Sequence, residues 1–503
     1  MTSVAASEFP LRLAPPEAFR RVEALFRAAG FEEAAICRTL KITELSTLGS
    51  VKREDMDFAS VAEGLALFIK LFLFGELVSR VEVERLLDTA AFDAFLALDL
   101  IRRGEFENEA YASPVFLYPV SNLYIASDRH HHPDGSPFVP PPDIVFPAIF
   151  AGTLRFLRLL SKRPAESALD LCAGSGIGAL TLSRHVKSVV SADITPRATH
   201  FARFNKLLNR CDNVEVAQGD LYDAVPGRTF ERIVAHPPYV PSLGDAMIFR
   251  DGGEAGETII HRLVAGLPEH LHPGGAFFSL GLGLDTTEGR FEERVRAWLG
   301  EARNDFDILF GVGDEKSPEQ VVENIMKRAK GIESASGGRL LDVFKSLGTI
   351  QCVYGALVIH RRLAQDGEPW TGRSRLSTQT DGESFDWLLG WHRRIGRADP
   401  PGWLCGARPS LSPALRLQVT HRVQEGELVP ASFLLETDKP FATAMRIDPW
   451  VIPLIARFDG ARTPAELHQA AQAAGEAPAD FGLNDFARLV ALLIERGYLV
   501  LKE

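Results

Sequence analysis

The stretch SALDLCAGSGIGALTLSRHV, residues 167–186, decides the fold of the middle of this chain. It begins as an apolar strand, continues into a glycine-rich loop and ends with the apolar spacing of a helix. Gly174, Gly176 and Gly178 let the backbone turn tightly and approach a ligand closely at the helix N-terminus. The stretch therefore predicts the first strand, loop and helix of a doubly wound parallel sheet.

Three further strand ends carry groups that suit a nucleoside ligand. SVVSADIT ends near Asp193, about twenty residues after the glycines, where a carboxylate meets ribose hydroxyls. NVEVAQGDLYD places Asp220 where a carboxylate reaches an adenine edge. The strand ERIVA runs into Ala-His-Pro-Pro-Tyr-Val, residues 235–240, whose two prolines end ladder pairing and fix the backbone. Because parallel strands end at one edge of a sheet, we expect these groups to meet there.

Length and composition bound the organisation of the chain. Its 503 residues exceed what one core holds, so two to four domains are expected. The composition, 46% hydrophobic and 24% charged, is typical of a soluble globular protein. The net charge of −11 counts against a large nucleic-acid footprint, which requires a basic face.

Targeting signals and cysteines indicate a cytoplasmic protein without membrane association. The start, MTSVAASEFPLRL, lacks the charged-then-apolar layout of a signal peptide. The most apolar run, residues 61–78, contains Glu63, Lys70 and Glu76, which favours a core helix over a membrane span. The five cysteines never form a CxxC pair and are expected to be free thiols.

The sequence predicts a central α/β domain between two smaller modules. Helical runs followed by a glycine and a hairpin indicate a winged-helix-like module at the N-terminus. Thr463, Pro464 and Glu466 form a helix-capping box near the start of a similar module at the C-terminus. The predicted segments are a helical, winged-helix-like module (1–112), a hairpin and Pro-rich connector (113–144), the α/β domain (145–362), a polar linker (363–385) and a small α+β winged-helix-like module (386–503).

Two motifs resemble those of class I S-adenosylmethionine-dependent methyltransferases. DLCAGSGIG looks like their first motif, and AHPPYVP looks like the (Asn/Asp/Ser)-Pro-Pro-(Tyr/Phe) motif of enzymes that methylate nitrogen in planar groups. The resemblance is closest to the HemK/PrmC type, which methylates a glutamine amide in release factors. It extends over residues 138–283, including FVPPPDIVFP (138–147) and RDGGEAGETIIHRLVAGLPEHLHPGG (250–275).

The resemblance implies a Rossmann-like α/β fold with a seven-stranded class I methyltransferase sheet in residues 145–362. It implies S-adenosyl-L-methionine as the cofactor and no metal. The methyl acceptor would lie at His236, Pro237, Pro238 and Tyr239. The cofactor would be bound by Asp143, Asp170, Cys172, Ala173, Gly174, Ser175, Gly176, Gly178, Asp193, Ile194, Asp220 and Leu221.

One residue departs from the family's pattern. The first residue of the second motif is usually asparagine, whose carbonyl accepts a hydrogen bond from the substrate amino group, and here it is His236. A neutral imidazole offers one acceptor and one donor, and it can also take up a proton. His236 is therefore expected either to position the acceptor or to act as a general base titrating near pH 6.5. The second role would admit hydroxyl, carboxyl or ring-nitrogen acceptors.

Two other clusters are weaker candidates. The adjacent histidines in RHHH, residues 129–132, cannot all face one ion, so a solvated turn is expected. Arg393, Arg394 and Arg397 are expected to form a solvated basic face.

Three functions fit the sequence. The first is methylation of a protein or peptide side chain, with the end modules gripping a macromolecule. The second is a small-molecule N- or O-methyltransferase of secondary metabolism, with the modules forming a lid or a homodimer contact. The third is a non-catalytic cofactor-binding regulator whose winged modules touch DNA. The acidic balance and the lack of a basic, aromatic surface run count against nucleic-acid methylation.

Overall fold

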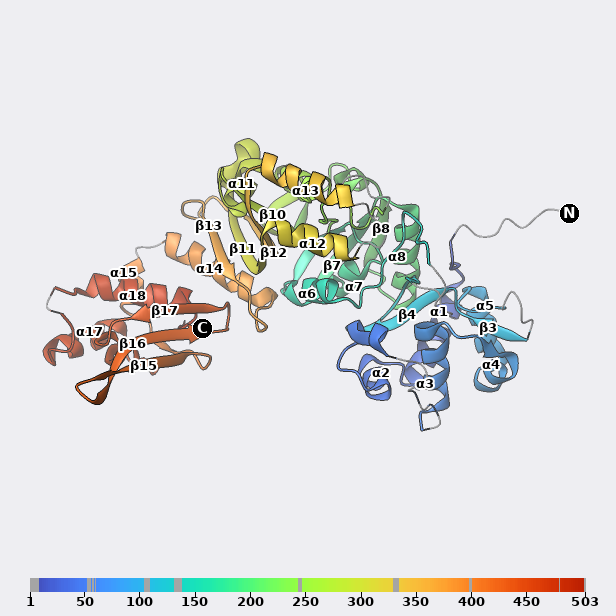
Figure 1. The fold of residues 1–503 in the computed structure, drawn as a ribbon, viewed down its shortest axis with the longest axis horizontal. Helices are drawn as coiled ribbons and strands as arrows, with labels where there is room; N and C mark the ends of the chain where they lie inside the picture. The colour runs from blue at the N-terminus through green and yellow to red at the C-terminus, as the bar shows by residue number, and fades with distance from the viewer. Residues whose placement is uncertain are drawn as a thin grey trace.

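The computed structural model describes residues 9–51, 56, 58, 60–103, 109–130, 138–242, 247–328, 334–397, 400–478 and 480–501. Figure 1 shows a central α/β domain between an N-terminal and a C-terminal module. The central domain carries both motifs singled out in the sequence, so its sheet determines where the site lies.

The central sheet has eight strands in the order β13-β11-β12-β10-β9-β6-β7-β8. β6, β7, β8, β9 and β10 run parallel to one another, whereas β12 is antiparallel to both β10 and β11. The strands are β6 (Ala165–Leu171), β7 (Val186–Asp193), β8 (Val214–Gln218), β9 (Phe230–Ala235), β10 (Leu271–Thr286), β11 (Phe306–Lys316), β12 (Thr349–Arg361) and β13 (Thr371–Arg375). This is the predicted Rossmann-like α/β sheet.

The predicted number of seven strands is wrong because β13 adds an eighth. β13 lies within residues 363–385, which the sequence predicted as a linker, and it pairs in parallel with the edge of β11. Its Arg373 donates hydrogen bonds to Asp285 at 2.6 and 2.7 Å and to Glu292 at 2.6 Å. The half-buried Asp285 and the buried Glu292 thus share one guanidinium, and these two ion pairs hold β13 against the domain.

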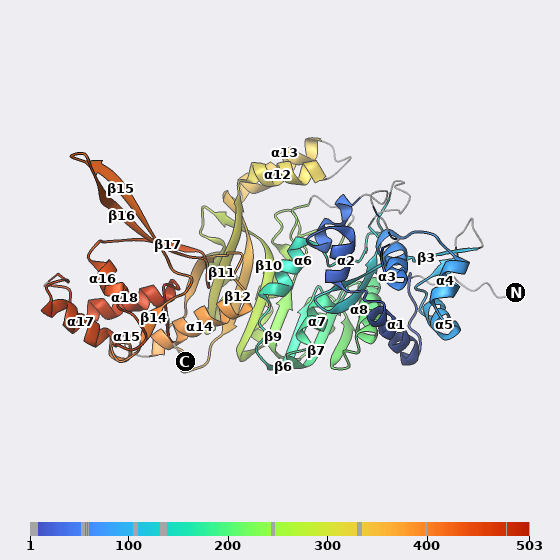
Figure 2. The ribbon, with the colours of Figure 1, turned by 90° about the horizontal axis from the view of Figure 1, so that it is seen from below.

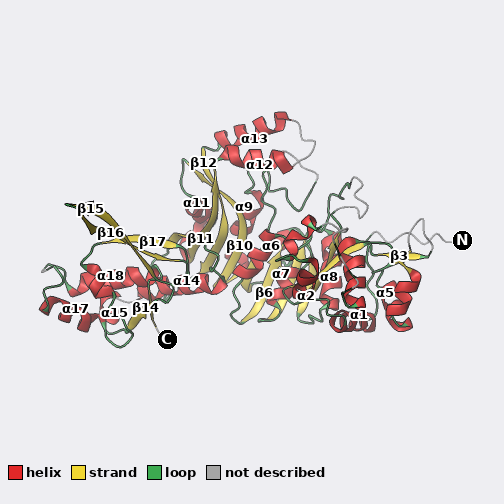
Figure 3. Cartoon of the chain, turned by 60° about the horizontal axis from the view of Figure 1, so that its bottom comes forward, coloured by secondary structure: helices red, strands yellow, loops and turns green. Residues whose placement is uncertain are grey.

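Helices cover both faces of the sheet (Figure 3). One face packs against α6 (Ala151–Leu159), α7 (Ile177–Leu182), α8 (Pro196–Leu208) and α14 (Gly382–Arg397). The other face packs against α9 (Thr258–Ala265), α10 (Leu267–His270) and α11 (Phe291–Trp298). Two cores therefore sandwich the strands and hold their ends in fixed register.

The strand register brings both motifs to one edge. Leu171, the last residue of β6, pairs with Ala235 at the end of β9 and with Ala192 near the end of β7. The glycine loop, the acidic end of β7 and His236 therefore leave the sheet at the same level. The order of the strands reverses between β6 and β9, which is where ligands bind in open α/β sheets.

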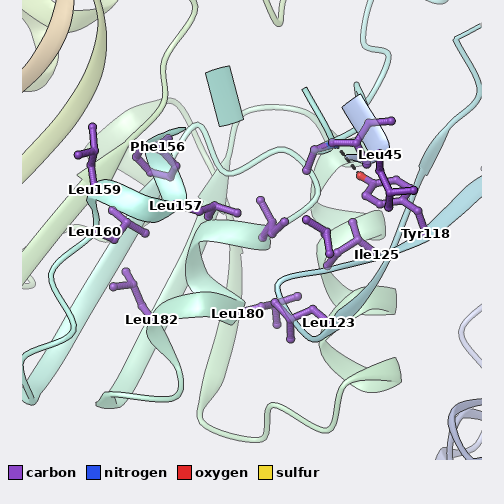
Figure 4. Close-up of a cluster of buried hydrophobic side chains, with 14 of the residues drawn as sticks. Leu45, Tyr118, Leu123, Ile125, Phe156, Leu157, Leu159, Leu160, Leu180 and Leu182 are labelled. Carbon is purple, nitrogen blue, oxygen red and sulfur yellow. Dashed lines mark hydrogen bonds between the residues drawn. The ribbon is translucent and has the colours of Figure 1, made fainter. Parts of the chain in front are cut away.

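The N-terminal module rests on α8. Its elements are α1 (Pro16–Ala28), α2 (Glu33–Leu40), α3 (Glu63–Phe68), α4 (Arg80–Leu86), α5 (Thr89–Ala97), β1 (Val78–Ser79), β2 (Arg102–Arg103), β3 (Ala110–Ala112), β4 (Val115–Val120) and β5 (Leu123–Asp128). Asn205 and Asn209 of α8 accept hydrogen bonds at 2.8 Å from the backbone amides of β5 residues Ala126 and Tyr124. Figure 4 shows Leu123 and Ile125 of β5 near Leu180 of α7 in the shared apolar core.

The apolar run at 61–78 is buried, as predicted, but it is not one α-helix. α3 ends at Phe68, and residues Ile69–Phe74 form a π-helical turn that stops at Gly75, whose φ is 72°. Within the described residues, no helix combines the length and apolarity needed to cross a membrane.

Two helices extend the sheet at the edge that bears the motifs. α12 (Pro318–Arg328) and α13 (Ser334–Ser346) lie between β11 and β12 along the chain and project beyond the sheet in Figure 2. Val321, Val322 and Phe344 pack with Leu284 of β10 in a third, smaller core. The described faces of these helices therefore border the region where β9 and β10 end.

The C-terminal module combines helices with a long hairpin. Its elements are α15 (Pro400–Leu404), β14 (Pro409–Leu411), β15 (Arg416–Gln424), β16 (Glu427–Thr437), β17 (Thr443–Ile447), α16 (Val451–Ile455), α17 (Pro464–Ala473), α18 (Leu483–Glu495) and β18 (Leu499–Leu501). The predicted capping box is confirmed, because the Glu466 amide donates to Thr463 Oγ1 and the Thr463 amide donates to Glu466 Oε2.

The predicted solvated face on α14 is wrong for Arg393, which is half-buried, whereas Arg394 is exposed. Arg393 Nη1 lies 2.8 Å from His360 Nε2, and the Arg394 guanidinium lies 4.0 Å from the centre of the Trp403 ring. The side chain of Arg397 lies outside the described residues. Arg393 and Arg394 thus join α14 to its neighbours instead of forming a free basic patch.

Candidate functional site

The glycine loop after β6 is open toward its ligand side. Gly174 and Gly176 have φ values of 53° and 80°, in the left-handed region that favours glycine. A Cβ at Gly176 would lie 3.0 Å from Ala202 Cβ, so the loop can lie against α8 only without a side chain there. A Cβ at Gly174 would meet nothing within 4 Å. The loop is therefore packed on one side and accessible on the other.

Asp170 holds this loop from beneath. Its buried Oδ2 accepts a hydrogen bond of 2.7 Å from the Ala179 amide in the first turn of α7. A Cβ at Gly178 would lie 2.6 Å from the same oxygen, which explains the third glycine of the loop. Burial raises the pKa of Asp170 to about 7. Asp170 thus orients the loop and the helix N-terminus from inside the domain.

Asp193 lies directly against the loop. Its Oδ2 accepts from the Gly174 amide at 2.9 Å and its Oδ1 accepts from the Thr195 amide at 3.0 Å. Burial raises the pKa of the Asp193 carboxyl. A carboxylate offers about four lone-pair sites, so each oxygen keeps capacity for a ligand hydroxyl. The neighbouring Ile194 is 50% exposed and offers an apolar surface beside that carboxylate.

Four other residues predicted to bind a cofactor surround the loop. Cys172 packs against the second core with φ 56°, and burial raises the pKa of its thiol. The carbonyl of the buried Ser175 accepts a hydrogen bond of 2.9 Å from Asn205. Ala173 and Gly176 close the turn through a hydrogen bond of 2.8 Å from the Gly176 amide to the Ala173 carbonyl.

The three remaining candidates lie farther from the loop's backbone contacts. Asp220 forms an ion pair of 2.9 Å with Arg262 of α9, so its carboxylate already has a cationic partner. Leu221 is buried beside it in the left-handed conformation. Asp143 is half-buried in the segment before α6, and its charge helps raise the pKa of Arg197.

His236 lies between two aromatic rings at the end of β9. Its ring stacks on Phe156 of α6 at 5.2 Å with an interplanar angle of 12°, and on Tyr239 at 5.9 Å and 30°. Its Nε2 is buried and has no hydrogen-bond partner within the described part of the chain. Burial lowers the pKa of His236 to about 4, well below the value near 6.5 of an unperturbed imidazole. At neutral pH the site holds a neutral imidazole with an unused nitrogen.

The segment after Tyr239 is pinned by the glycine-rich stretch at 250–256. The Val240 amide donates to the Arg250 carbonyl and the Gly252 amide donates to the Val240 carbonyl, both at 3.0 Å. A Cβ at Gly256 would lie 2.6 Å from the Tyr239 carbonyl oxygen, so only glycine allows this approach. The stretch therefore fixes the backbone that carries Pro237, Pro238 and Tyr239.

Two residues that no sequence motif predicted, Gly152 and Tyr354, lie beside His236 and Tyr239 in the structure. A Cβ at Gly152 of α6 would lie 3.7 Å from Tyr354 Oη and 3.9 Å from both His236 Cε1 and Tyr239 Oη. Tyr354 of β12 is hydrogen-bonded to Tyr239, and burial raises the pKa of its hydroxyl. No local pattern marks either residue, since each reaches the site only through the order of strands and helices.

Comparison with known proteins assigns the family. A family model described as the methyltransferase small domain matches residues 148–281. A Methanocaldococcus jannaschii protein named as a protein N5-glutamine methyltransferase is 30% identical over 141 residues, which are 27% of this chain and 70% of that protein. This chain belongs to the HemK/PrmC-like methyltransferase family.

Two further members of this family are named for their substrates. The ribosomal protein uL3 glutamine methyltransferase of Bradyrhizobium diazoefficiens is 29% identical over 159 residues, 29% of this chain and 50% of that protein. The release factor glutamine methyltransferase of Koribacter versatilis is 36% identical over 135 residues, 24% of this chain and 48% of that protein. The chain thus spans about half the length of these two relatives.

The loop suits S-adenosylmethionine, the cofactor of the family. A Cβ at Gly174 would meet nothing within 4 Å, which leaves space beside the half-buried residues 172–174 of the loop. Asp193 is half-buried beside the loop and Ile194 is 50% exposed next to it. Asp170 and Ser175, by contrast, are buried and support the loop from within.

Within the described residues, no group of three or more His, Cys, Asp or Glu side chains is arranged to hold an ion. His130 packs among Phe116, Phe146 and Phe150, and residues 131 and 132 of the histidine run lie outside the described part.

Proposed function

We propose that this chain transfers a methyl group from S-adenosylmethionine to a side-chain amide nitrogen of a protein. The observation that carries the proposal is the neutral His236, whose buried Nε2 has no partner among the described residues and lies beside the rigid Pro-Pro-Tyr segment. A buried nitrogen without a partner is costly unless a ligand satisfies it. An amide N–H of the acceptor would do so.

The chain's own residues would act by position. Asp193, Gly174 and Ile194 hold the cofactor, which supplies an electrophilic methyl group on its sulfonium when bound. In the tautomer that carries its proton on Nδ1, His236 Nε2 accepts a hydrogen bond from the N–H of the acceptor amide. This hydrogen bond orients the lone pair of the amide nitrogen. The aromatic rings of Phe156 and Tyr239 fix the imidazole plane and keep water from that nitrogen.

A base role for His236 is the weaker alternative. A general base works best when its pKa is near the working pH, and burial lowers the pKa of His236 to about 4. His236 would then replace the family's asparagine as a hydrogen-bond acceptor, not as a proton acceptor. In the transfer to an amide nitrogen, the N–CH3 bond forms as the cofactor's S–CH3 bond breaks, and the amide loses one N–H proton to solvent.

The relatives support a protein acceptor, since two are named for glutamine residues of ribosomal protein uL3 and of release factors. We propose that the two end modules, which we still interpret as winged-helix-like, contact that macromolecule or a second copy of the chain. Methylation of a small molecule and a non-catalytic role are the alternatives that the following experiment distinguishes.

The test is transfer of labelled methyl groups to a lysate of cells that lack the gene. The proposal predicts that label enters a protein band and that mass spectrometry places one methyl group on a glutamine or asparagine amide. Asp193→Ala, with its cofactor site impaired, is the matched control and should not label that band. Label found only in small molecules would favour the second function. Cofactor binding by calorimetry without any transfer would favour the non-catalytic regulator.

A further inference from the structure

We propose that Arg155 binds a carboxylate of the methyl acceptor, so that the acceptor amide lies next to an acidic group. The inference rests on the proposed function and adds a specificity residue to the same site. It starts from the face that α6 turns toward the pocket. Gly152 and Phe156 on that face meet His236, and Arg155 follows Gly152 by three residues, which places it on the same side of the helix.

The guanidinium of Arg155 lies against an irregularity in β11. The pairing of β11 with β12 shifts between Val312 and Asp314, so Gly313 is an unpaired bulge residue next to Asp314, which pairs with Tyr354. A Cβ at Gly313 would lie 2.4 Å from Arg155 Nη2 and 2.7 Å from Nη1. The guanidinium can therefore occupy this position only because Gly313 has no side chain. Bulges often occur next to active sites, where they redirect neighbouring groups.

Among the described residues, no carboxylate lies within ion-pair distance of Arg155, and the charge of Asp314 acts on it only from farther away. In the described ranges of the chain it forms neither a hydrogen bond nor an ion pair, although it is half-buried. The nearest acid, Asp314, is engaged by Lys316 and by the Glu315 amide. Burial lowers the pKa of Arg155, as expected for a partly desolvated cation without a partner. By contrast Arg294 and Arg373, also half-buried, each bind carboxylates of this domain.

The position of Arg155 relates it to the acceptor. Tyr354, which pairs with the residue next to the bulge, has its hydroxyl 3.7 Å from the point at Gly152 that lies 3.9 Å from His236 Cε1. An acceptor amide at His236 therefore has Tyr354 on one side and the guanidinium beyond it. The planar fork of an arginine matches a carboxylate with two parallel hydrogen bonds. The carboxylate could belong to an acidic side chain or to a free C-terminus next to the amide.

Three short peptides with an acetylated N-terminus separate these sources. Each contains one glutamine. It is followed in the first peptide by glutamate with an amidated C-terminus, in the second by alanine with an amidated C-terminus, and in the third by alanine with a free C-terminal carboxylate. Their binding to the full chain, with S-adenosylhomocysteine present to prevent turnover, is measured by competition in saturation-transfer NMR. We expect at least one acidic peptide to bind roughly tenfold more tightly than the neutral one, and the stronger of the two identifies the source of the carboxylate.

The variants test whether Arg155 causes this preference. Arg155→Met should abolish it, and Gly313→Ala should abolish it as well, because the new Cβ displaces the flexible guanidinium while the backbone stays in place. Arg155→Lys should retain part of it. Arg158→Met on the same helix is the matched control and should leave it intact, because Arg158 donates to the Thr378 carbonyl at the surface. Thermal unfolding verifies that each variant is folded.

Equal binding of acidic and neutral peptides to the wild-type chain would overturn the inference, as would a preference that survives Arg155→Met. Absence of binding by all three peptides would overturn it too. Failure of the proposed function looks different, because the acidic preference would persist while labelled methyl groups reach none of the bound peptides.

Discussion

Replacing His236 tests how the pocket handles the acceptor nitrogen. If Nε2 accepts an amide N–H, His236→Ala leaves that donor buried without a partner. Such a loss costs about 1–3 kcal/mol, which corresponds to a decrease of roughly five- to 150-fold in kcat/KM. The cofactor affinity should stay unchanged, because no contact of the glycine loop or of Asp193 involves His236.

The size of the replacement adds a second comparison. The buried atom without a partner is Nε2, which lies one bond farther from the backbone than the amide group of an asparagine side chain. His236→Gln places an oxygen at nearly the reach of Nε2 and should keep activity within about fivefold. His236→Asn restores the family's motif but has the shorter reach, so its activity should fall between those of the Gln and Ala variants.

The pH profile decides between positioning and base catalysis. With the pKa of His236 lowered to about 4, the imidazole is neutral at pH 5.5 to 8, and kcat should be flat over that range. As the pH falls toward 4, protonation turns Nε2 into a donor and activity should decline. Initial rates with labelled cofactor and the acceptor identified by labelling measure this. An inflection near pH 6.5, an inactive His236→Gln, or a fully active His236→Ala would exclude positioning of the acceptor by a neutral His236.

Other predictions follow from contacts around the loop. Asp193→Ala should weaken S-adenosylmethionine binding by about 1–3 kcal/mol, since it removes the ribose acceptor and leaves the Gly174 amide without its partner; unchanged affinity by calorimetry would remove this assignment. Asn205→Ala leaves polar groups of Ala126 and the Ser175 carbonyl buried without partners, so urea unfolding should show a loss of roughly 3 kcal/mol. Gly152→Leu should fill the pocket at Tyr354 and abolish methyl transfer while calorimetry shows normal cofactor binding; retained activity would place the acceptor elsewhere.

The sequence predicted those parts of the site that follow strand ends closely along the chain. The glycine loop, Asp193 and His236 each lie within a few residues of an apolar strand, and the parallel sheet brings them to one edge. Arg155 and Tyr354 could not be found in this way. Arg155 comes from a helix before the first strand of the sheet and Tyr354 from the antiparallel β12. Only the completed fold brings Tyr354 to the His-Pro-Pro-Tyr motif and Arg155 to the bulge of β11.

The eighth strand shows the same limit. Residues 371–375, Thr-Gly-Arg-Ser-Arg, lack the apolar alternation of a strand and resemble a linker. They pair because the edge of β11 is free and because Arg373 neutralises Asp285 and Glu292. Both carboxylates are distant from Arg373 in the sequence, so no local sequence pattern indicates these ion pairs. The pKa of His236 is a similar case, since its burial by Phe156 depends on the packing of α6.

Mass spectrometry of the protein that this chain labels identifies the methylated atom most directly. We expect a mass increase of one methyl group in a single peptide, and fragmentation should place this group on a side-chain amide nitrogen. The mass increase should be absent when the Asp193→Ala variant is used. A methyl group on a hydroxyl, a carboxylate or a small molecule would contradict the account.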